Sequence, residues 1–420
     1  MSGNQGDAPR RDHGLPPPSP FQRLSRVHAL MTAGDAFMAI SLADSLFLSI
    51  SPDAARTRVI LFLAVSMAPF AVVAPLIGPL IDRMRGGQRI VVMVVAVLRA
   101  AVLVGMASSL DSLTLFPLAF AALVLSKTYA VSKSALVPVT VPDPERFVEA
   151  NSRLGLIAGI AGFVVAAPAV GLQVIDPRAP LVTGALAFLA AGLNARRLPR
   201  VVIADSPPDA LETEELHQPE VVAAAIAMRA LRVAVGFQFF HLAFWLRSEI
   251  AGTAWFGLAI AVSSLSTNAA NLVGPRVRER MRNQTMLVTA LALVTVAGAA
   301  CAWWNRVTAG VVLTGVVYAS AAIGRLAFEA TVQENAPDAN RGRVFARFEA
   351  QNQLAWVAGG LVPVAVSPSG WIGFAMVGAV GAAGAWLHLR TARDLRGLRD
   401  ARATNRGRRS RSESGGGTDQ

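Results

Sequence analysis

Long apolar runs, separated by short polar segments, make up most of the chain. A helix needs about 20 apolar residues to cross a hydrocarbon layer of roughly 30 Å. Twelve runs of about this length are present, so we expect twelve membrane-spanning helices, over residues 28–50, 57–81, 90–109, 113–137, 153–175, 180–198, 224–247, 254–274, 284–304, 308–331, 347–366 and 371–390. The predicted fold class is an all-α membrane protein.

Two short segments recur at a nearly constant spacing. A Gly-Pro pair beginning at Gly78 returns at Gly274, 196 residues later, and a segment ending in Pro-Asp at Asp143 returns at Asp338, 195 residues later. Such a repeat indicates a duplicated unit. We expect two pseudo-symmetric six-helix bundles at 28–198 and 224–390, a cytoplasmic linker at 199–223, and disordered tails at 1–27 and 391–420.

Arginine is distributed unevenly over the predicted loops. Fourteen arginines fall in short loops on the side of the N-terminus, and five fall in the opposite loops. Positive charge accumulates on the cytoplasmic side of membrane proteins, so we expect a multi-pass protein of the plasma or inner membrane with both termini in the cytoplasm. Five tryptophans then lie at outer helix ends, where indole rings favour the membrane interface: Trp245, Trp255, Trp303, Trp304 and Trp371.

The composition limits other functional classes. Hydrophobic residues make up 53% of the chain and charged residues 16%, with a mean hydropathy of +0.47, whereas soluble domains carry about 25% charged residues. The net charge of +12 lies largely in short loops and an arginine-rich tail, so we assign it to anionic lipid headgroups and not to nucleic acid. No nucleotide-binding loop, Gly-x-Ser-x-Gly or His-Glu-x-x-His motif occurs, so we expect no enzyme, no cofactor and no metal.

Ionisable residues inside predicted helices are the candidates for chemistry. Asp35 and Asp44 lie in the first helix, and Lys127 and Lys133, the only lysines, lie in the fourth. A charge near the bilayer centre is costly and tends to face a partner or a wet cavity. The two aspartates point to opposite sides of their helix, so at most one lines a central cavity. Lys133 either extends to lipid headgroups or joins the deeper Lys127 in binding a proton or substrate.

The seventh and tenth helices supply further candidates. We expect Arg229 and Arg232 at headgroup level. His241 is either a packed side chain among aromatic neighbours or a proton carrier. Arg325 and Glu329, at positions i and i+4, are close enough to pair, either as a brace at the helix end or as a substrate or proton site.

The turn from Gly78 to Arg89 resembles a known motif. It resembles the loop between helices 2 and 3 of major facilitator superfamily (MFS) transporters, which reads Gly, three residues, Asp, Arg or Lys, then a glycine and basic residues. Gly78, Asp82 and Arg83 match this pattern, while the glycine comes one residue late, at Gly86. The resemblance implies two parallel six-helix halves around a central cavity, and a cytoplasmic gate at Gly78, Asp82, Arg83 and Arg89.

Two further features refine the resemblance. Arg99 in the third helix, as a structural charge, and the segment from Ala135 to Asn151 are similar to the macrolide and enterobactin exporter subgroup, which favours efflux. The fifth helix carries Gly155-x-x-x-Gly159-x-x-Gly162, which partly resembles drug–proton antiporters. Close helix packing explains these glycines equally well.

Together these features predict a monomeric, proton-coupled MFS exporter of a small amphipathic organic compound, such as a drug, siderophore or metabolite. Asp35 and Asp44 are the expected proton sites, and the two halves are expected to rock around the cavity. A lipid or lysolipid flippase of the same fold and a non-transporting membrane scaffold remain as alternatives.

Overall fold

The described part of the protein is helical. The computed structural model describes residues 18–47, 87–110, 112, 114–199, 219–246, 249–335 and 341–414. The first half of the chain forms α1 (Pro20–Phe47), α4 (Gly87–Ala107), α5 (Leu115–Thr140), the 3-10 helix η3 (Pro144–Arg146), α6 (Phe147–Ile175) and α7 (Ala179–Ala195). The second half forms α9 (Pro219–Trp245), α10 (Gly252–Arg280), α11 (Asn283–Trp304), α12 (Val307–Asn335), α13 (Arg341–Val366) and α14 (Gly370–Ser414). These helices correspond to the predicted spans, except that span 57–81 lies outside the described residues.

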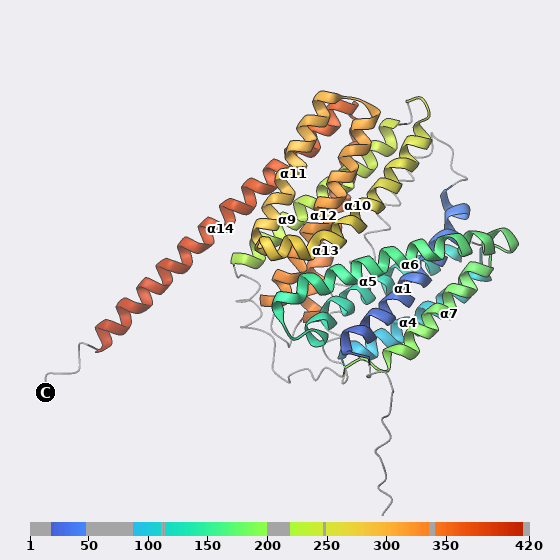
Figure 1. Cartoon of the computed structure of the whole chain (residues 1–420), viewed down its shortest axis with the longest axis horizontal. Helices are drawn as coiled ribbons and strands as arrows, with labels where there is room; N and C mark the ends of the chain where they lie inside the picture. The colour runs from blue at the N-terminus through green and yellow to red at the C-terminus, as the bar shows by residue number, and fades with distance from the viewer. Residues whose placement is uncertain are drawn as a thin grey trace, which may run out of the picture.

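The helices form two bundles, one from each half of the chain (Figure 1). In the first bundle, α7 packs against α1 and α4, and α6 packs against α1. In the second, α9 packs against α13 and α14, and α11 packs against α12 and α14. The bundles meet where α6 contacts α10 and α12 and where α5 contacts α13. This boundary holds the candidate site.

The outer surface suits a lipid environment. Among the described residues, seven helices are long and apolar enough to cross a membrane: α4, α5, α6, α10, α11, α12 and α14. Phe163 and Val174 on α6 are 84% and 83% exposed. Large exposed apolar surfaces of this kind mark contact with a membrane or another protein, and the length of the helices favours the membrane.

The first helix begins eight residues before the predicted span. Ser19 and Gln22 form a capping box, in which the Ser19 N–H donates to Gln22 Oε1 at 2.9 Å and the Gln22 N–H donates to Ser19 Oγ at 3.2 Å. Pro20 is the first helical residue, a position that proline favours because no donor is lost there. Leu24 and Val27 are fully buried, so the predicted disordered tail 1–27 is wrong from residue 20.

Two other predicted boundaries also move. The linker prediction 199–223 is wrong at its end, because α9 begins at Pro219 and buries Val221 and Ala223. The predicted disordered tail from residue 391 is wrong as far as Ser414, because α14 continues to that residue. Its sequence after Arg390 is rich in Arg, which favours helix, and contains no proline.

Candidate functional site

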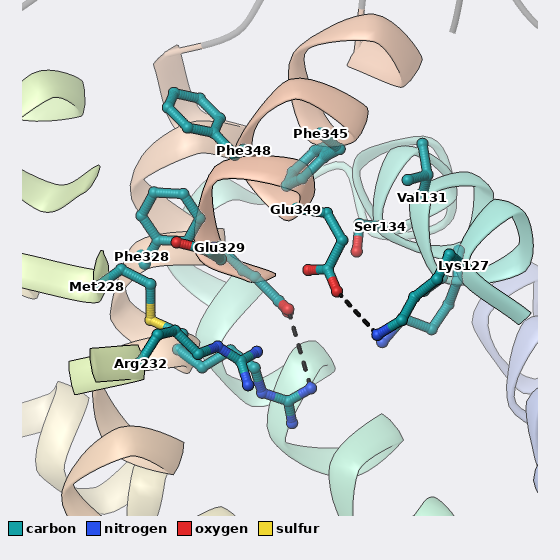
Figure 2. A pocket seen from close by; sticks show the side chains of 14 residues that line it. Lys127, Val131, Ser134, Met228, Arg232, Phe328, Glu329, Phe345, Phe348 and Glu349 are labelled. Carbon is teal, nitrogen blue, oxygen red and sulfur yellow. Dashed lines mark hydrogen bonds and ion pairs between the residues drawn. The ribbon is translucent and has the colours of Figure 1, made fainter. Parts of the chain in front are cut away.

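A cavity of about 240 Å³ lies between the two bundles (Figure 2). Its walls come from α5 of the first bundle and from α9, α12 and α13 of the second. Six charged side chains line it: Lys127, Lys133, Arg232, Arg325, Glu329 and Glu349. The remaining walls are mainly apolar, and include Met228, Phe328, Phe345 and Phe348.

An ion pair crosses the cavity from one bundle to the other. Lys127 Nζ on α5 lies 3.3 Å from Glu349 Oε1 on α13, as Figure 2 shows. Both side chains are partly accessible, at 29% and 27%. The bundles cannot separate along this line without breaking the pair, so the contact is sensitive to their relative position.

A second ion pair lies within α12. Arg325 Nη1 is 3.9 Å from Glu329 Oε1, so the two side chains pair as their i, i+4 spacing predicts. Both side chains line the cavity. Glu329, the second carboxylate of the cavity, is therefore paired with Arg325.

The other two cations of the cavity, Lys133 and Arg232, interact with Glu329 and Glu349 only beyond ion-pair distance. Neither Lys133 nor Arg232 forms an ion pair within the described residues. Arg232 Nε is buried without a hydrogen-bond partner there, and Lys133 is only 9% exposed. With four cationic and two acidic side chains, the cavity carries a formal excess of two positive charges.

Polar contacts close the boundary where α6 begins and α12 ends. Asn151 Nδ2 donates to Gln333 Oε1 at 2.8 Å, and Gln333 Nε2 donates to the Ser134 carbonyl at 3.1 Å. The Ser152 hydroxyl donates to the Asn271 carbonyl of α10. Each of these bonds joins the two bundles, so they hold the bundles together at this end.

Glycines of α6 allow this helix to lie close to α10 of the other bundle. A Cβ at Gly159 would overlap the Asn268 side chain of α10, whereas a Cβ at Gly162 would meet nothing within 4 Å. The first two glycines of the predicted motif thus serve packing between the bundles. The bundles are in contact at Gly159, whereas a side chain at Gly162 would have room.

Asp35 and Arg99 form an ion pair away from the cavity. Arg99 of α4 is fully buried and donates from both terminal nitrogens to the Asp35 carboxylate of α1, with Nη1 3.3 Å from Oδ2. Its guanidinium also lies 4.1 Å from the ring centroid of Phe188 on α7. This pair and the Phe188 contact tie three helices of the first bundle together.

His241 is packed among aromatic side chains. It is 1% exposed, stacks on Trp245 with a centroid distance of 5.9 Å, and meets Phe374 edge-on at 5.6 Å. It does not line the described cavity. Of the two interpretations given from the sequence, the structure favours a packed side chain.

Several predicted site residues lie outside the described residues. These are the gate candidates Gly78, Asp82 and Arg83, together with the side chain of Asp44. The fourth gate candidate, Arg89, is half-buried near the start of α4.

Sequence reasoning missed Glu349 and misplaced Arg232. Arg232 was expected at headgroup level, yet it lines the cavity. Glu349 had a detectable signal, because Arg347 to Asn352, reading Arg-Phe-Glu-Ala-Gln-Asn, nearly repeats Arg146 to Asn151, reading Arg-Phe-Val-Glu-Ala-Asn. The two segments are 201 residues apart, close to the spacing of the internal repeat, so the similarity marks the start of α13 as the counterpart of the start of α6.

Two mycobacterial proteins are similar to this chain over most of its length. It is 31% identical over 393 residues to "Uncharacterized protein ML2143" of Mycobacterium leprae (strain TN), with 83% of this chain and 67% of that protein covered. The chain belongs to the family of that protein. A second member, "Uncharacterized protein Rv0876c" of Mycobacterium tuberculosis (strain ATCC 25618 / H37Rv), is 32% identical over 394 residues, with 83% and 69% covered. No family model matches the sequence.

Solved structures of transporters share the fold of this chain. A bacterial homologue of the iron transporter ferroportin, in an outward-facing state, aligns with a TM-score of 0.66 and 16% identity, covering 90% of this chain and 100% of that one. The MFS transporter FucP in the outward conformation aligns with a TM-score of 0.64, 13% identity and coverages of 88% and 98%. The human organic anion transporter MFSD10 (TETRAN) aligns with a TM-score of 0.64 and 15% identity, covering 88% of this chain and 100% of that one. The predicted MFS fold is confirmed, and these neighbours are transporters, not enzymes.

Proposed function

We propose that this protein is a secondary transporter that exports a small amphipathic organic compound by alternating access, driven by the proton gradient. The observation that carries the proposal is the cavity between the bundles, lined by charged and apolar side chains from both. Sites of this kind lie at the interface of the repeats in MFS transporters, and rocking of the repeats exposes them to each side in turn. We place both termini in the cytoplasm, from the arginine distribution.

The contacts between the bundles support such rocking. Hydrogen bonds from Asn151 and Ser152 join the bundles at the end where α6 begins. A few polar contacts of this kind can exchange with water when the bundles separate, at a net cost of roughly 1 kcal/mol each. We therefore propose that this end, predicted to be cytoplasmic, opens in the alternate state.

We propose Glu349 as the proton carrier. Its carboxylate lines the cavity and is held by Lys127 of the opposite bundle. When the bundles separate, the carboxylate loses the Lys127 cation, while Arg232 and Arg325 stay in its own bundle. Removing a nearby cation makes a carboxylate easier to protonate, so separation favours proton uptake relative to the state in which Lys127 is paired. Asp35, the carrier expected from the sequence, is instead held by Arg99 outside the cavity.

The transport function can be tested by an accumulation screen. Cells with and without the protein are compared for retention of a panel of drugs, siderophores, metabolites and lysolipids, before and after collapse of the proton gradient. We expect at least one compound to be retained less in cells that contain the protein, with the difference abolished by gradient collapse. Transport of lysolipids alone would favour a flippase, and no difference for any compound would contradict the proposal.

The proposed proton carrier gives a first prediction. Glu349→Gln removes the titratable group while keeping the shape of the side chain, so export should lose its dependence on the proton gradient and fall by roughly tenfold or more. The readout is export of a compound found in the screen, measured in proteoliposomes with an imposed pH gradient.

A matched variant separates loss of the proton from loss of the ion pair. Lys127→Gln also breaks the Lys127–Glu349 contact but leaves the carboxylate in place, so its export should still respond to the pH gradient. A Glu349→Gln protein with wild-type pH dependence would exclude Glu349 as the carrier.

A further inference from the structure

We propose that the transported compound is an organic anion, whose negative group binds in the cavity that Lys133 of α5 and Arg232 of α9 help to line. The inference rests on the proposed transport function and adds the chemical class of the substrate. It follows from the charges that line the cavity, from their pairing, and from the two bundles that supply them.

The cavity has more positive charge than its own acids can neutralise. Its two carboxylates, Glu329 and Glu349, are already paired with Arg325 and Lys127. Lys133 and Arg232 form no ion pair among the described residues, and Arg232 Nε has no hydrogen-bond partner there. The two carboxylates are shared among four cations, so two positive charges remain in excess. An uncompensated charge away from water is costly, and a bound anion would remove that cost.

These two cations have suitable chemistry and position. A guanidinium presents a planar fork of donors that matches a carboxylate or a phosphate, and an ammonium adds a compact charge. Lys133 belongs to the first bundle and Arg232 to the second. An anion held by both would therefore draw the bundles together, which couples its binding to their relative position.

The size and lining of the cavity indicate what the rest of the substrate, beyond its anionic group, is like. Its volume of about 240 Å³ lies just below the roughly 300–1,000 Å³ of typical ligand pockets. Phe328 and Phe348 meet edge-to-face at 5.3 Å in one wall, beside Met228. These features suit a small organic anion with an apolar or aromatic part, or the anionic end of a longer molecule.

The same charges disfavour positively charged cargo. A metal cation or an organic amine would enter a cavity with two uncompensated positive charges, and like charges repel strongly where the effective dielectric is low. The chain shares its fold with a bacterial homologue of the iron transporter ferroportin, yet the charges of its cavity disfavour a metal cation.

A cysteine reporter in the cavity tests the inference without knowledge of the substrate. Ala130 lines the cavity one turn from both Lys127 and Lys133. Ala130→Cys, combined with Cys301→Ser to remove the single native thiol, is reconstituted as the full chain in liposomes. Its thiol is then treated with membrane-impermeant methanethiosulfonates of opposite charge, the anionic sulfonatoethyl and the cationic trimethylammonioethyl reagents, from each side in turn.

We expect the anionic reagent to react faster, once both rates are divided by those of the same reagents with free 2-mercaptoethanol. This ratio cancels any change in the reactivity of the thiol itself. Arg232→Gln and Lys133→Met should each lower the ratio by roughly tenfold or more, because each removes a charge within reach of the thiol. A normalised ratio that favours the cationic reagent, or that neither substitution changes, would overturn the inference.

Arg229 provides a matched control on the same helix. It lies three residues before Arg232, does not line the cavity, and donates from Nε to the Ala225 carbonyl at 3.1 Å. Arg229→Gln removes the same charge outside the cavity, so solvent screening should keep its effect within about twofold. A decrease as large as that of Arg232→Gln would show a general surface effect and would contradict the inference.

The accumulation screen completes the test and separates the two proposals. Compounds exported by the protein should carry a negative charge at neutral pH, and an exported set made up of cations would overturn the anion inference while leaving the transport function intact. If neither reagent labelled Ala130→Cys from either side and no compound were exported, the transport function itself would fail.

Discussion

Asp35→Leu should destabilise the folded protein by about 2–3 kcal/mol, because it leaves the fully buried Arg99 guanidinium without its acid. The Asp35 side chain is itself 36% exposed, so the loss should fall below the roughly 3–5 kcal/mol of a wholly buried pair. Arg99 is fully buried and donates to Asp35 from both terminal nitrogens. A guanidinium remains charged in proteins, so Arg99 cannot escape the loss by giving up a proton. The effect is measured as the loss of folded fraction during unfolding in mixed detergent micelles.

The double variant Asp35→Leu/Arg99→Met should recover most of the stability. Replacing both members of a buried pair by apolar residues is often neutral or stabilising, and a methionine can still pack against Phe188. The four proteins form a double-mutant cycle, which isolates the interaction between the two side chains. If the loss of stability in the double variant equalled the sum of the losses in the two single variants, the interaction between the side chains would contribute little.

The same double variant also bears on coupling. If Asp35 serves structure alone, the double variant should export with the pH dependence of the wild type. Loss of that dependence, with the fold intact, would return Asp35 to the role of proton site that the sequence first suggested.

Gly159→Val should shift the protein toward the state in which the bundles separate at the beginning of α6. A side chain at Gly159 would overlap Asn268 of α10, and overpacking typically costs about 1–3 kcal/mol. The cost falls only on the state in which the bundles touch there. The Ala130→Cys thiol should then label roughly tenfold faster from that side of the membrane, since about 1.4 kcal/mol corresponds to a tenfold change in population.

Gly162→Val is the matched control in the same motif. A Cβ at Gly162 meets nothing within 4 Å, so this variant should label at nearly the wild-type rate. An equal increase in both variants would mean that the valine acts on α6 itself and not on its contact with α10.

The fold could be predicted from the sequence because its main signals are local. Apolar runs of spanning length and a repeat near 195 residues are visible without knowledge of any contact. The beginning of α1 was missed although its capping box, Ser19 with Gln22, is a recognisable signal. The prolines before it suggested disorder and hid that signal.

The site was predicted only in part, and the reason is physical. Hydropathy places a span where charge is sparse, so charged residues at the inner end of a helix are assigned to loops or headgroups. Since α13 begins at Arg341, Glu349 lies about 12 Å along the helix, and Arg232 lies about 20 Å beyond the start of α9 at Pro219. Both residues therefore lie far enough along their helices to reach the cavity, although their charge suggests a position near the helix end.

The Asp35–Arg99 ion pair also could not be predicted from the sequence. Asp35 and Arg99 were both recognised as charges within helices, but they are 64 residues apart and on different elements. Which of them faces the other depends on the rotation of α1 and α4 about their axes, which is set by packing on α7. The Arg325–Glu329 pair, by contrast, lies within one helix, so its spacing was enough to predict it.

The length of α14 has a practical consequence. With 45 residues, this helix is about 68 Å long, whereas the hydrocarbon layer is roughly 30 Å thick. Its arginine-rich half must therefore leave the bilayer, and Figure 1 shows it extending away from both bundles. A fluorescent or affinity tag attached where α14 ends, at Ser414, would stand clear of the moving parts, which makes the end of this helix a suitable place for a probe of transport.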